Sequence, residues 1–272
     1  MLDIGLLPQA IRRYTEGSDV SALKLKGRSS VYHIAGSDGA YCLKIAHARE
    51  RLQREADMLR FLAEDGLAPE SICFESDRER EREYLLMEVV PGHDATDNRY
   101  LANPAKLCET FAESLTRLHS LKTAGCPTVN GLEDMVRRAE DNFRNGRCDR
   151  SLLRYLECAD PAAAFDELTA IVRHVSWDKG VVIHGDYCLP NVMLQHWRLS
   201  GFIDVGYGGV GDPHYDLFWG MWSLQFNLED VRWAHRFLEA YGRHLIDPDR
   251  QRLCGLISAF NGFRGQDYYT EE

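Results

Sequence analysis

The chain has 272 residues, of which 44% are hydrophobic and 27% are charged. This composition is typical of a globular protein and excludes collagen-like and low-complexity architectures. The 32 Lys and Arg residues are outnumbered by 42 Asp and Glu, which gives a formal net charge of −10. Because nucleic-acid binding by bulk charge needs a basic surface, we expect no nucleic-acid partner. The negative balance favours a cationic partner.

The cysteines and the apolar runs indicate the compartment. The eight cysteines are scattered and form no Cys-x-x-Cys pair, which disfavours zinc and dithiol redox motifs. No apolar run approaches the roughly 18 residues of a membrane span, so no membrane partner is expected. Asp3 and Pro8 make a signal peptide improbable. We therefore expect a reduced, soluble, cytoplasmic protein.

The N-terminal third predicts five strands and one helix. The helix is expected over about 49–64, because apolar residues recur at helical spacing from Leu52 to Ala63 and Gly66 then marks its end. The charged run 77–83 is typical of a solvated hairpin tip. The strands, recognised by alternating or apolar runs bounded by turn residues, are expected at 23–26, 31–34, 40–45, 71–75 and 84–90.

After Pro91 the pattern becomes helical. Helices are expected at 105–119, 132–145, 152–157 and 164–175, and from Leu217, Leu228 and Asp249. A short β insert is expected at 181–183, 191–194 and 201–205. The chain is therefore predicted to be an α+β protein with two lobes. The first, 1–90, holds an antiparallel five-stranded sheet and one helix; the second, 91–272, is mainly helical with a β-hairpin insert.

One segment carries the clearest chemical signal. An apolar strand ends in His184-Gly185-Asp186, a four-residue loop follows, and Asn191 opens the next apolar strand. Asp204 ends another apolar strand, which the hairpin returns beside Asn191. An amide oxygen and a carboxylate that converge suit Mg²⁺. Asp186 lies close without having to be a ligand, so it is free to orient or deprotonate a hydroxyl. Alternatively, these polar residues only cap turns. A capping role would explain any one of them, but it explains the whole pattern poorly.

The pattern His184-Gly-Asp186-x-x-x-x-Asn191 with Asp204-x-Gly206 resembles the catalytic and metal-binding loops of the protein-kinase-like fold. Its His-Gly-Asp form, together with the stretch 201–217 and Leu118-His119-Ser120, resembles the aminoglycoside phosphotransferase family, above all its 3′-phosphotransferases. The similarity runs over about 23–260. It implies a nucleotide-binding first lobe, a catalytic and substrate-binding second lobe, ATP or GTP with Mg²⁺ as cofactors, and Asp186 as the catalytic residue. It further implies that Asn191 and Asp204 hold the metal and that Asp216 supports the catalytic loop.

The resemblance also implies nucleotide-binding residues in the first lobe. Lys44, a charge in an apolar strand, would hold the α- and β-phosphates, and Glu55, which borders the apolar stripe of the helix, would position it. Alternatively, Lys44 is only a charge at a strand edge and Glu55 only a solvated helix residue. Glu50 is a rival partner for Lys44. Ser29 and Ser30 match a reduced phosphate loop, although a plain hairpin turn fits equally well.

The backbone of Glu88 and Val90 matches the inter-lobe hinge, where the family's adenine is bound. Cys42 stands where family members often place an aromatic ring against adenine, so the choice between ATP and GTP stays open.

The acceptor is less well specified. The family's acceptors are polycationic aminoglycosides, held by carboxylates of the second lobe. The segment that matches a helical acidic pair reads Gln225-Phe226-Asn227 and has no charge. Candidate acceptor contacts are therefore Asp149, Asp186, Gln225 and Asn227, with further negative charge from 140–149, Asp160 and 267–272.

We expect transfer of a γ-phosphoryl group to an aminoglycoside 3′-hydroxyl, which confers antibiotic resistance, by a monomer or weak dimer. One alternative is a kinase of another small alcohol or amino alcohol. A more distant alternative is a non-catalytic nucleotide-binding pseudokinase, which the presence of Lys44, Asp186, Asn191 and Asp204 disfavours.

Overall fold

The computed structural model describes residues 2–25, 29–37, 39–47, 51–176 and 180–261. The chain divides into two compact units. The first comprises Met1–Ala95 and Pro190–Tyr207, and the second Thr96–Leu189 and Gly208–Glu272. The lobes expected at 1–90 and 91–272 differ from this division, chiefly because the segment Pro190–Tyr207 groups with the N-terminal residues. The assignment of nucleotide binding to one lobe and acceptor binding to the other stays a prediction.

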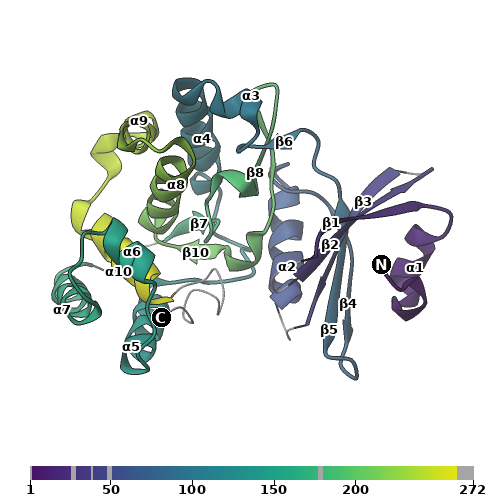
Figure 1. Ribbon diagram of the computed structural model, residues 1–272, viewed down its shortest axis with the longest axis horizontal. Coiled ribbons are helices and arrows are strands. Elements are labelled where there is room, and N and C mark those ends of the chain that lie inside the picture. Colours follow the sequence, from purple (N-terminus) through teal and green to yellow (C-terminus); the bar gives the residue numbers. More distant parts are fainter. Residues whose placement is uncertain (1, 26–28, 38, 48–50, 177–179, 262–272) are drawn as a thin grey trace. The chain divides into compact units, whose positions relative to one another are not determined.

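The first unit is built on an antiparallel sheet with the strand order β1-β2-β3-β5-β4 (Figure 1). Its strands are β1 (Asp19–Lys24), β2 (Ser29–Gly36), β3 (Gly39–Ala46), β4 (Ser71–Asp77) and β5 (Arg82–Glu88). The five expected strands are confirmed, although β1 begins four residues before its predicted start. In the register of β3 with β5, Lys44 lies opposite Leu85 and Cys42 opposite Met87.

Helix α2 (Arg51–Ala63) confirms the predicted helix and buries Leu52, Ala56 and Leu59. It ends at Ala63, shortly before the predicted stop signal Gly66, whose φ of +65° suits glycine; the amide of Leu67 donates to the carbonyl of Leu62 at 3.0 Å. The opposite face of the sheet packs on η1 (Ile4–Leu6) and α1 (Gln9–Thr15), through Leu7 and Ile11. The sequence analysis placed no element before residue 23, because a seven-residue helix with one apolar contact carries almost no periodic signal.

A three-stranded sheet explains why Pro190–Tyr207 groups with the first unit. Its strand order is β6-β8-β9, and its members are β6 (His93–Asp94), β8 (Val192–Gln195) and β9 (Arg198–Phe202). The short helices η2 (Leu189–Asn191) and η3 (Val205–Tyr207) flank the β8–β9 hairpin. The amide of Phe202 donates to the carbonyl of Leu67 at 2.7 Å. Gly92 is required at the entry, because a Cβ there would lie 2.2 Å from the carbonyl oxygen of Leu194.

The second unit is mainly helical, as expected. Its helices are α3 (Asn98–Leu101), α4 (Pro104–His119), α5 (Leu132–Arg144), α6 (Arg150–Tyr155), α7 (Pro161–Val172), α8 (Pro213–Leu228), α9 (Val231–Tyr241), η4 (Arg243–Leu245) and α10 (Pro248–Asn261). The apolar faces of α5, α6, α7, α8 and α10 meet in one core that includes Leu168, Tyr215, Trp219, Leu256 and Phe260. No helix in the described ranges is long and apolar enough to cross a membrane. The predicted α+β class is confirmed.

The expected β insert needs a correction. β7 (Val181–Ile183) does not join the β8–β9 hairpin but pairs with β10 (Gly209–Gly211), a strand that the sequence analysis did not predict. The sequence of β10, Gly-Val-Gly, has low strand propensity. Glycine is nevertheless needed there, because a Cβ on Gly211 would lie 2.5 Å from the side chain of Ile183.

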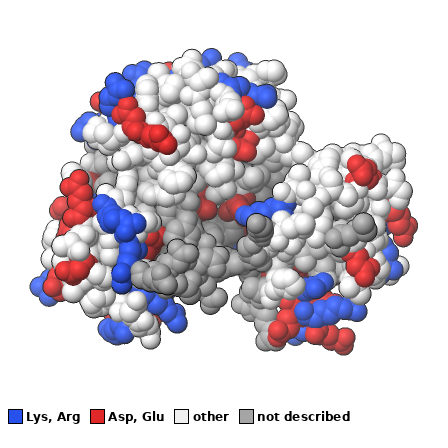
Figure 2. Space-filling model, in the orientation of Figure 1, with Lys and Arg blue, Asp and Glu red and all other residues white. Residues whose placement is uncertain are grey.

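Charged side chains of both signs are interspersed over the described surface on the face in view (Figure 2).

Candidate active site

A buried lysine forms the centre of the first unit's polar cluster. Lys44 extends from β3, and its Nζ lies 2.9 and 2.7 Å from the two carboxylate oxygens of Glu55 on α2. The same Nζ bonds the carboxylate of Asp204, which follows β9. Lys44 and Glu55 are 9% and 4% exposed. The pairing implied by the family resemblance is therefore present; the rival Glu50 lies outside the described residues.

The two carboxylates keep the Lys44 ammonium charged. Burial alone lowers the pKa of Lys44, but the negative charges of Glu55 and Asp204 outweigh it and raise that pKa above its ordinary value. A permanently charged ammonium, fixed by a buried glutamate, is a suitable partner for phosphate oxygens.

Asn191 and Asp204 come together as the sequence predicted. The amide of Ile203 donates to the carbonyl of Asn191 at 3.1 Å, which sets the end of β9 beside the end of η2. Asp204 has a φ of +60°, a left-handed conformation that Asp tolerates better than most residues. The donor set, one amide and one carboxylate oxygen, suits Mg²⁺ when phosphates and water complete its shell. Among the described residues, no group of three or more His, Cys, Asp and Glu is arranged to hold a metal by itself.

The remaining nucleotide candidates lie around the same sheet. Ser29 and Ser30 open β2 and pair with Ala46 and Ile45, whereas Gly27 and Arg28 of the expected phosphate loop lie outside the described residues.

At the predicted hinge, the backbone amide of Glu88 donates to the carbonyl of Glu70 at 3.1 Å. The backbone of Glu88 therefore has only its carbonyl oxygen left to bind a nucleobase. Val90 is buried. Burial raises the pKa of Cys42, two residues before Lys44, to about 11.

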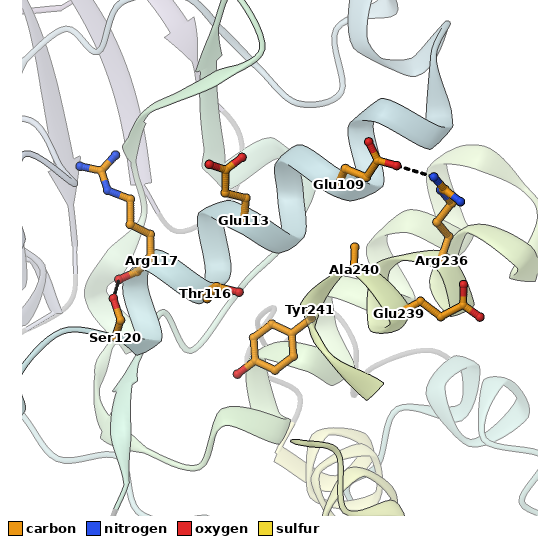
Figure 3. A pocket seen from close by; sticks show the side chains of 9 residues that line it. All are labelled: Glu109, Glu113, Thr116, Arg117, Ser120, Arg236, Glu239, Ala240 and Tyr241. Atoms are coloured by element: carbon orange, nitrogen blue, oxygen red, sulfur yellow. Dashed lines mark hydrogen bonds and ion pairs between the residues drawn. The ribbon is translucent and has the colours of Figure 1, made fainter. Parts of the chain in front are cut away.

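In the second unit, a cavity of about 720 Å³ opens between α4 and α9 (Figure 3). Glu109 and Arg236 form an ion pair across it. Its lining residues are Glu109, Glu113, Thr116, Arg117, Ser120, Arg236, Glu239, Ala240 and Tyr241. None of these was predicted as a site residue, but Tyr241 connects this cavity, through His119 and Asp216, to the predicted catalytic loop.

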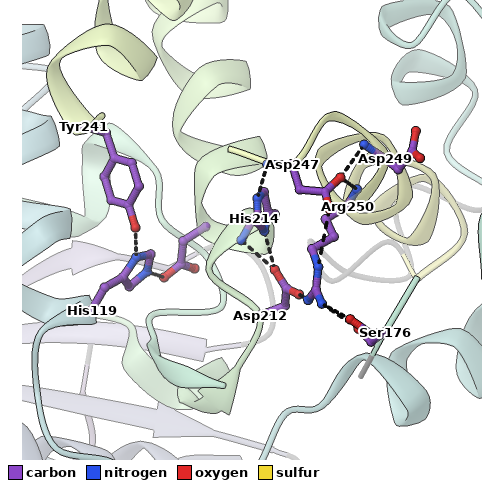
Figure 4. Close-up of polar contacts among 9 residues, drawn as sticks. His119, Ser176, Asp212, His214, Tyr241, Asp247, Asp249 and Arg250 are labelled. Atoms are coloured by element: carbon purple, nitrogen blue, oxygen red, sulfur yellow. Dashed lines mark hydrogen bonds and ion pairs between the residues drawn. The ribbon is translucent and has the colours of Figure 1, made fainter. Parts of the chain in front are cut away.

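That connection runs through His119 (Figure 4). The Nε2 of His119 lies 3.2 Å from Asp216 Oδ2, and its Nδ1 lies 2.9 Å from the Tyr241 hydroxyl. A carboxylate only accepts, so a neutral His119 donates from Nε2 and accepts at Nδ1 from the tyrosine. Burial, followed by the carboxylates of Asp216 and Asp212, raises the pKa of Tyr241 to about 12, which keeps this donor protonated. The sequence analysis noted His119 only as part of the resemblance and missed Tyr241, because a partner 122 residues away leaves no local pattern.

Asp216 holds the predicted catalytic loop by its backbone, as the resemblance implied. It is fully buried, and its two oxygens accept from the amides of His184 at 2.6 Å and Gly185 at 2.8 Å. Gly185 has a φ of +77°, a conformation that favours glycine. A fixed carboxylate on α8 therefore sets the course of the chain just before Asp186.

The rest of the loop is also fixed. The buried His184 accepts from the amide of Asp186 at Nδ1 (3.3 Å), a contact that holds the loop in place. The thiol of Cys188 lies 3.4 Å from Asp186 Oδ1. The amide of Leu189 donates to the hydroxyl of Ser223 on α8 at 2.9 Å. Asp186, half-buried, is thus a carboxylate on a preorganised loop.

A second network joins the starts of α8 and α10 (Figure 4). Asp212 accepts from Arg250 Nη1 at 2.6 Å and lies 2.7 Å from His214 Nδ1. The amide of Asp247 donates to His214 Nε2 at 2.9 Å. Burial tends to raise the pKa of Asp212, but hydrogen bonds from His214 and Arg250 outweigh it and lower that pKa below its ordinary value. The network fixes the helix that carries Asp216.

The candidate acceptor residues are placed unequally. Asp149 is 4% exposed and caps α6, accepting from the amides of Ser151 and Leu152 at 2.8 and 3.0 Å. This is a helix-capping role, different from the expected acceptor contact. Asp160 likewise caps α7 through the amide of Ala163.

Gln225 and Asn227 lie near the end of α8, and Asn227 donates to the carbonyl of Ser223 at 2.7 Å. The tail 267–272 lies outside the described residues.

Comparison with known proteins supplies an independent observation. A model of the APH family, described as a phosphotransferase enzyme family, matches residues 20–256. A probable aminoglycoside 3′-phosphotransferase of Lactococcus lactis is 32% identical over 259 residues, which cover 95% of this chain and 97% of the relative. An aminoglycoside 3′-phosphotransferase of Niallia circulans is 32% identical over 233 residues, 85% of this chain and 87% of that one.

The fold has solved counterparts. The aminoglycoside phosphotransferase APH(3'')-Id from Streptomyces rimosus superposes with a TM-score of 0.74 at 24% identity, covering 96% of this chain and 99% of that one. The same enzyme has also been solved in complex with ADP and streptomycin.

Proposed function

The chain belongs to the APH phosphotransferase enzyme family, and from this premise we propose that it transfers the γ-phosphoryl group of a nucleoside triphosphate, ATP or GTP, to the 3′-hydroxyl of an aminoglycoside. The names of the Lactococcus and Niallia relatives support this acceptor, and the ADP complex of the Streptomyces enzyme supports the nucleotide. The observation that carries the proposal is the cluster in which the buried Lys44 bonds both the buried Glu55 and the exposed Asp204. The expected consequence for a cell is aminoglycoside resistance.

In this proposal, Lys44 binds the nucleotide's α- and β-phosphate oxygens, and Glu55 orients it. Ser29, Ser30 and the hinge backbone at Glu88 and Val90 complete the nucleotide site. Asn191 and Asp204 hold Mg²⁺, which when bound neutralises charge on the phosphates. Asp204 bonds Lys44 in this structure. When nucleotide and Mg²⁺ are bound, the Asp204 carboxylate must therefore be shared between the Lys44 ammonium and the metal.

Asp186 serves the acceptor. It accepts a hydrogen bond from the acceptor hydroxyl and takes its proton as the oxygen attacks the γ-phosphorus. The bond from the γ-phosphorus to the bridging oxygen breaks, and its electron pair leaves with the nucleoside diphosphate. The loop contacts of Asp216 and His184 keep the Asp186 carboxylate in place before the acceptor binds, so little reorganisation is needed.

Replacement of Asp186 tests this role. Asp186→Asn keeps the shape and removes the base, so the rate of transfer is expected to fall by about 10²–10⁴ while nucleotide binding is unchanged. A coupled assay of ADP release measures the rate. Asp134→Asn, a carboxylate change at an exposed position of α5, is the matched control and is expected to be neutral. Near wild-type turnover by Asp186→Asn contradicts the assignment.

The metal half of the proposal has its own measurement. With only two protein oxygens assigned to it, Mg²⁺ is expected to bind weakly to the free enzyme and more tightly when nucleotide phosphates complete its shell. Titration calorimetry with and without a non-hydrolysable ATP analogue compares the two affinities. Tight Mg²⁺ binding without nucleotide, or full affinity retained by Asp204→Asn, speaks against these ligands.

The acceptor class is decided by a screen. ADP release is measured across 4,5- and 4,6-linked aminoglycosides and across simple alcohols and amino alcohols. Turnover only with simple alcohols favours the alternative kinase, and nucleotide binding without any turnover favours a pseudokinase.

The proposal also places the enzyme in the cytoplasm as a monomer or weak dimer, without a nucleic-acid or membrane partner. None of its eight cysteines is in a disulfide in the structure, which suits a reducing compartment, and light scattering measures its oligomeric state.

A further inference from the structure

Phe226 on α8 is unusually exposed for an aromatic residue of this protein. The side chain of Phe226 is 66% exposed, whereas every other phenylalanine and tryptophan in the described ranges is buried or half-buried. Phe226 stacks on Trp222, one turn earlier, with ring centroids 5.0 Å apart and an interplanar angle of 11°. The two rings are therefore stacked, and the Phe226 ring is exposed to water.

This aromatic pair lies on the stretch of α8 that contacts the catalytic loop. The hydroxyl of Ser223 accepts from the amide of Leu189, and the carbonyl of Trp219 lies 4.0 Å from the thiol of Cys188. Phe226 follows Ser223 by three residues, so both lie on neighbouring parts of one helix side. The exposed ring is therefore presented about one helical turn from the loop that carries Asp186.

The polar residues next to Phe226 do not supply charge at this place. Asn227 uses its side-chain amide to bond the carbonyl of Ser223 at 2.7 Å, within its own helix. Gln225 is neutral and half-buried. Beside Phe226, Gln225 and Asn227 thus bring no carboxylate, and the nearest one in sequence is that of Glu229, the exposed C-cap of α8.

We propose that Trp222 and Phe226 form an aromatic shelf that binds one amino-substituted ring of the acceptor. The apolar C–H face of a sugar or aminocyclitol ring packs flat on Phe226, and an ammonium group lies over the ring face, where the aromatic quadrupole attracts a cation. Trp222 holds Phe226 in the required orientation. This inference rests on the proposed function, because it needs the acceptor hydroxyl at Asp186.

Three replacements of Phe226 test the shelf. Phe226→Ala removes the ring and is expected to raise the KM for a cationic acceptor about tenfold, with the KM for nucleotide unchanged. Phe226→Leu keeps apolar area without a π face and is expected to recover only part of this loss. Phe226→Tyr keeps the ring and is expected to behave as the wild type. Leu245→Ala, which removes another exposed apolar side chain of the same unit, is the matched control.

The outcomes separate the shelf from the proposed function. If the wild type turns over an aminoglycoside and Phe226→Ala shows an unchanged acceptor KM, the shelf is wrong and the proposed function stands. Equal KM values for Phe226→Leu and the wild type overturn the contribution of the π face. If the wild type phosphorylates no acceptor, both fail. Thermal unfolding of each variant confirms that the exposed position leaves the fold intact.

Discussion

Lys44 illustrates how a single buried charge depends on its partners. Its ammonium and the Glu55 carboxylate are both removed from water, and each is tolerated only because the other is within hydrogen-bond distance. Asp204, whose side chain is 47% exposed, adds a second carboxylate that solvent screens in part. The Asp204 carboxylate can therefore bind another cation while Glu55 remains the partner of Lys44.

Removing the lysine is expected to destabilise the fold. Lys44→Met leaves the buried Glu55 carboxylate beside Asp204 without a cation, which costs about 3 kcal/mol in the free energy of unfolding. Urea unfolding of the variant measures this loss. The double variant Lys44→Met/Glu55→Gln removes both charges and is expected to regain much of it, although nucleotide binding stays impaired. A single variant as stable as the wild type contradicts the energetic interpretation of the pair.

At the scale of elements, α8 shows how close packing and function meet in one helix. Its N-terminal turn carries Asp212 and Asp216, its middle contacts the catalytic loop, and its Gly220 admits α9. A Cβ on Gly220 would lie 2.9 Å from the ring of Phe237 and 3.3 Å from that of Phe111, both fully buried. Glycine lowers helix propensity, and the fold accepts this loss because the helices approach so closely there.

Gly220→Ala is expected to destabilise the protein although alanine is the better helix former. Its gain in propensity of about 1 kcal/mol is outweighed by overpacking against Phe237, which costs about 1–3 kcal/mol. The net loss is read from the urea midpoint. Shortening the neighbouring ring with Phe237→Leu is expected to relieve the clash, so the double variant is less destabilised than the sum of the two singles. Additive losses rule out the contact as the cause.

The network that joins α8 to α10 makes stability depend on pH. The pKa of Asp212 is lowered in the folded state, so its stabilising contribution is present above the ordinary value of about 3.9 and is lost as the pH falls through the lower folded value. Asp212→Asn is therefore expected to be less stable than the wild type at pH 7, with a gap that narrows below about pH 5. Denaturant unfolding across pH 3.5–7 measures the gap. A gap that is constant with pH contradicts the assignment.

At the scale of the whole molecule, the eight cysteines, none of which is in a disulfide, bear on stability and reactivity. Burial raises the pKa of Cys108 to about 12, and the pKa values of Cys73, Cys126, Cys148 and Cys158 are also raised. Only the thiolate attacks, so these thiols are poorly reactive at neutral pH.

We expect a thiol reagent such as a disulfide dye to label the native protein slowly at neutral pH and all eight cysteines rapidly in denaturant. A reductant is expected to leave the urea midpoint unchanged, because the structure holds no disulfide among these eight residues. Rapid labelling of the native protein contradicts the raised pKa values of these thiols. Fewer than eight reactive thiols in unreduced, denatured protein indicates a disulfide.

Much of the fold and of the candidate site could be predicted from sequence, because those features are local. Strand alternation and helical periodicity marked the five-stranded sheet, α2 and most helices of the second unit. The short spacing from Asp186 to Asn191, and the hairpin that returns Asp204, identified the oxygen donors by their local pattern alone. Lys44 and Glu55 were paired through the resemblance, and the structure places them in contact. The catalytic roles of these residues stay predictions.

Other features were decided only by contacts between distant parts of the chain. The glycine-rich strand β10 forms because it pairs with β7, which contains Ile183. Tyr241 bonds His119, which lies 122 residues earlier in the chain. Asp149 was predicted from the sequence as an acceptor contact, but in the structure it is buried and caps α6. The aromatic shelf likewise depends on which side chains the helices leave uncovered. Local sequence sets which element a segment forms, whereas tertiary packing decides which polar groups are already bonded and which rings face water.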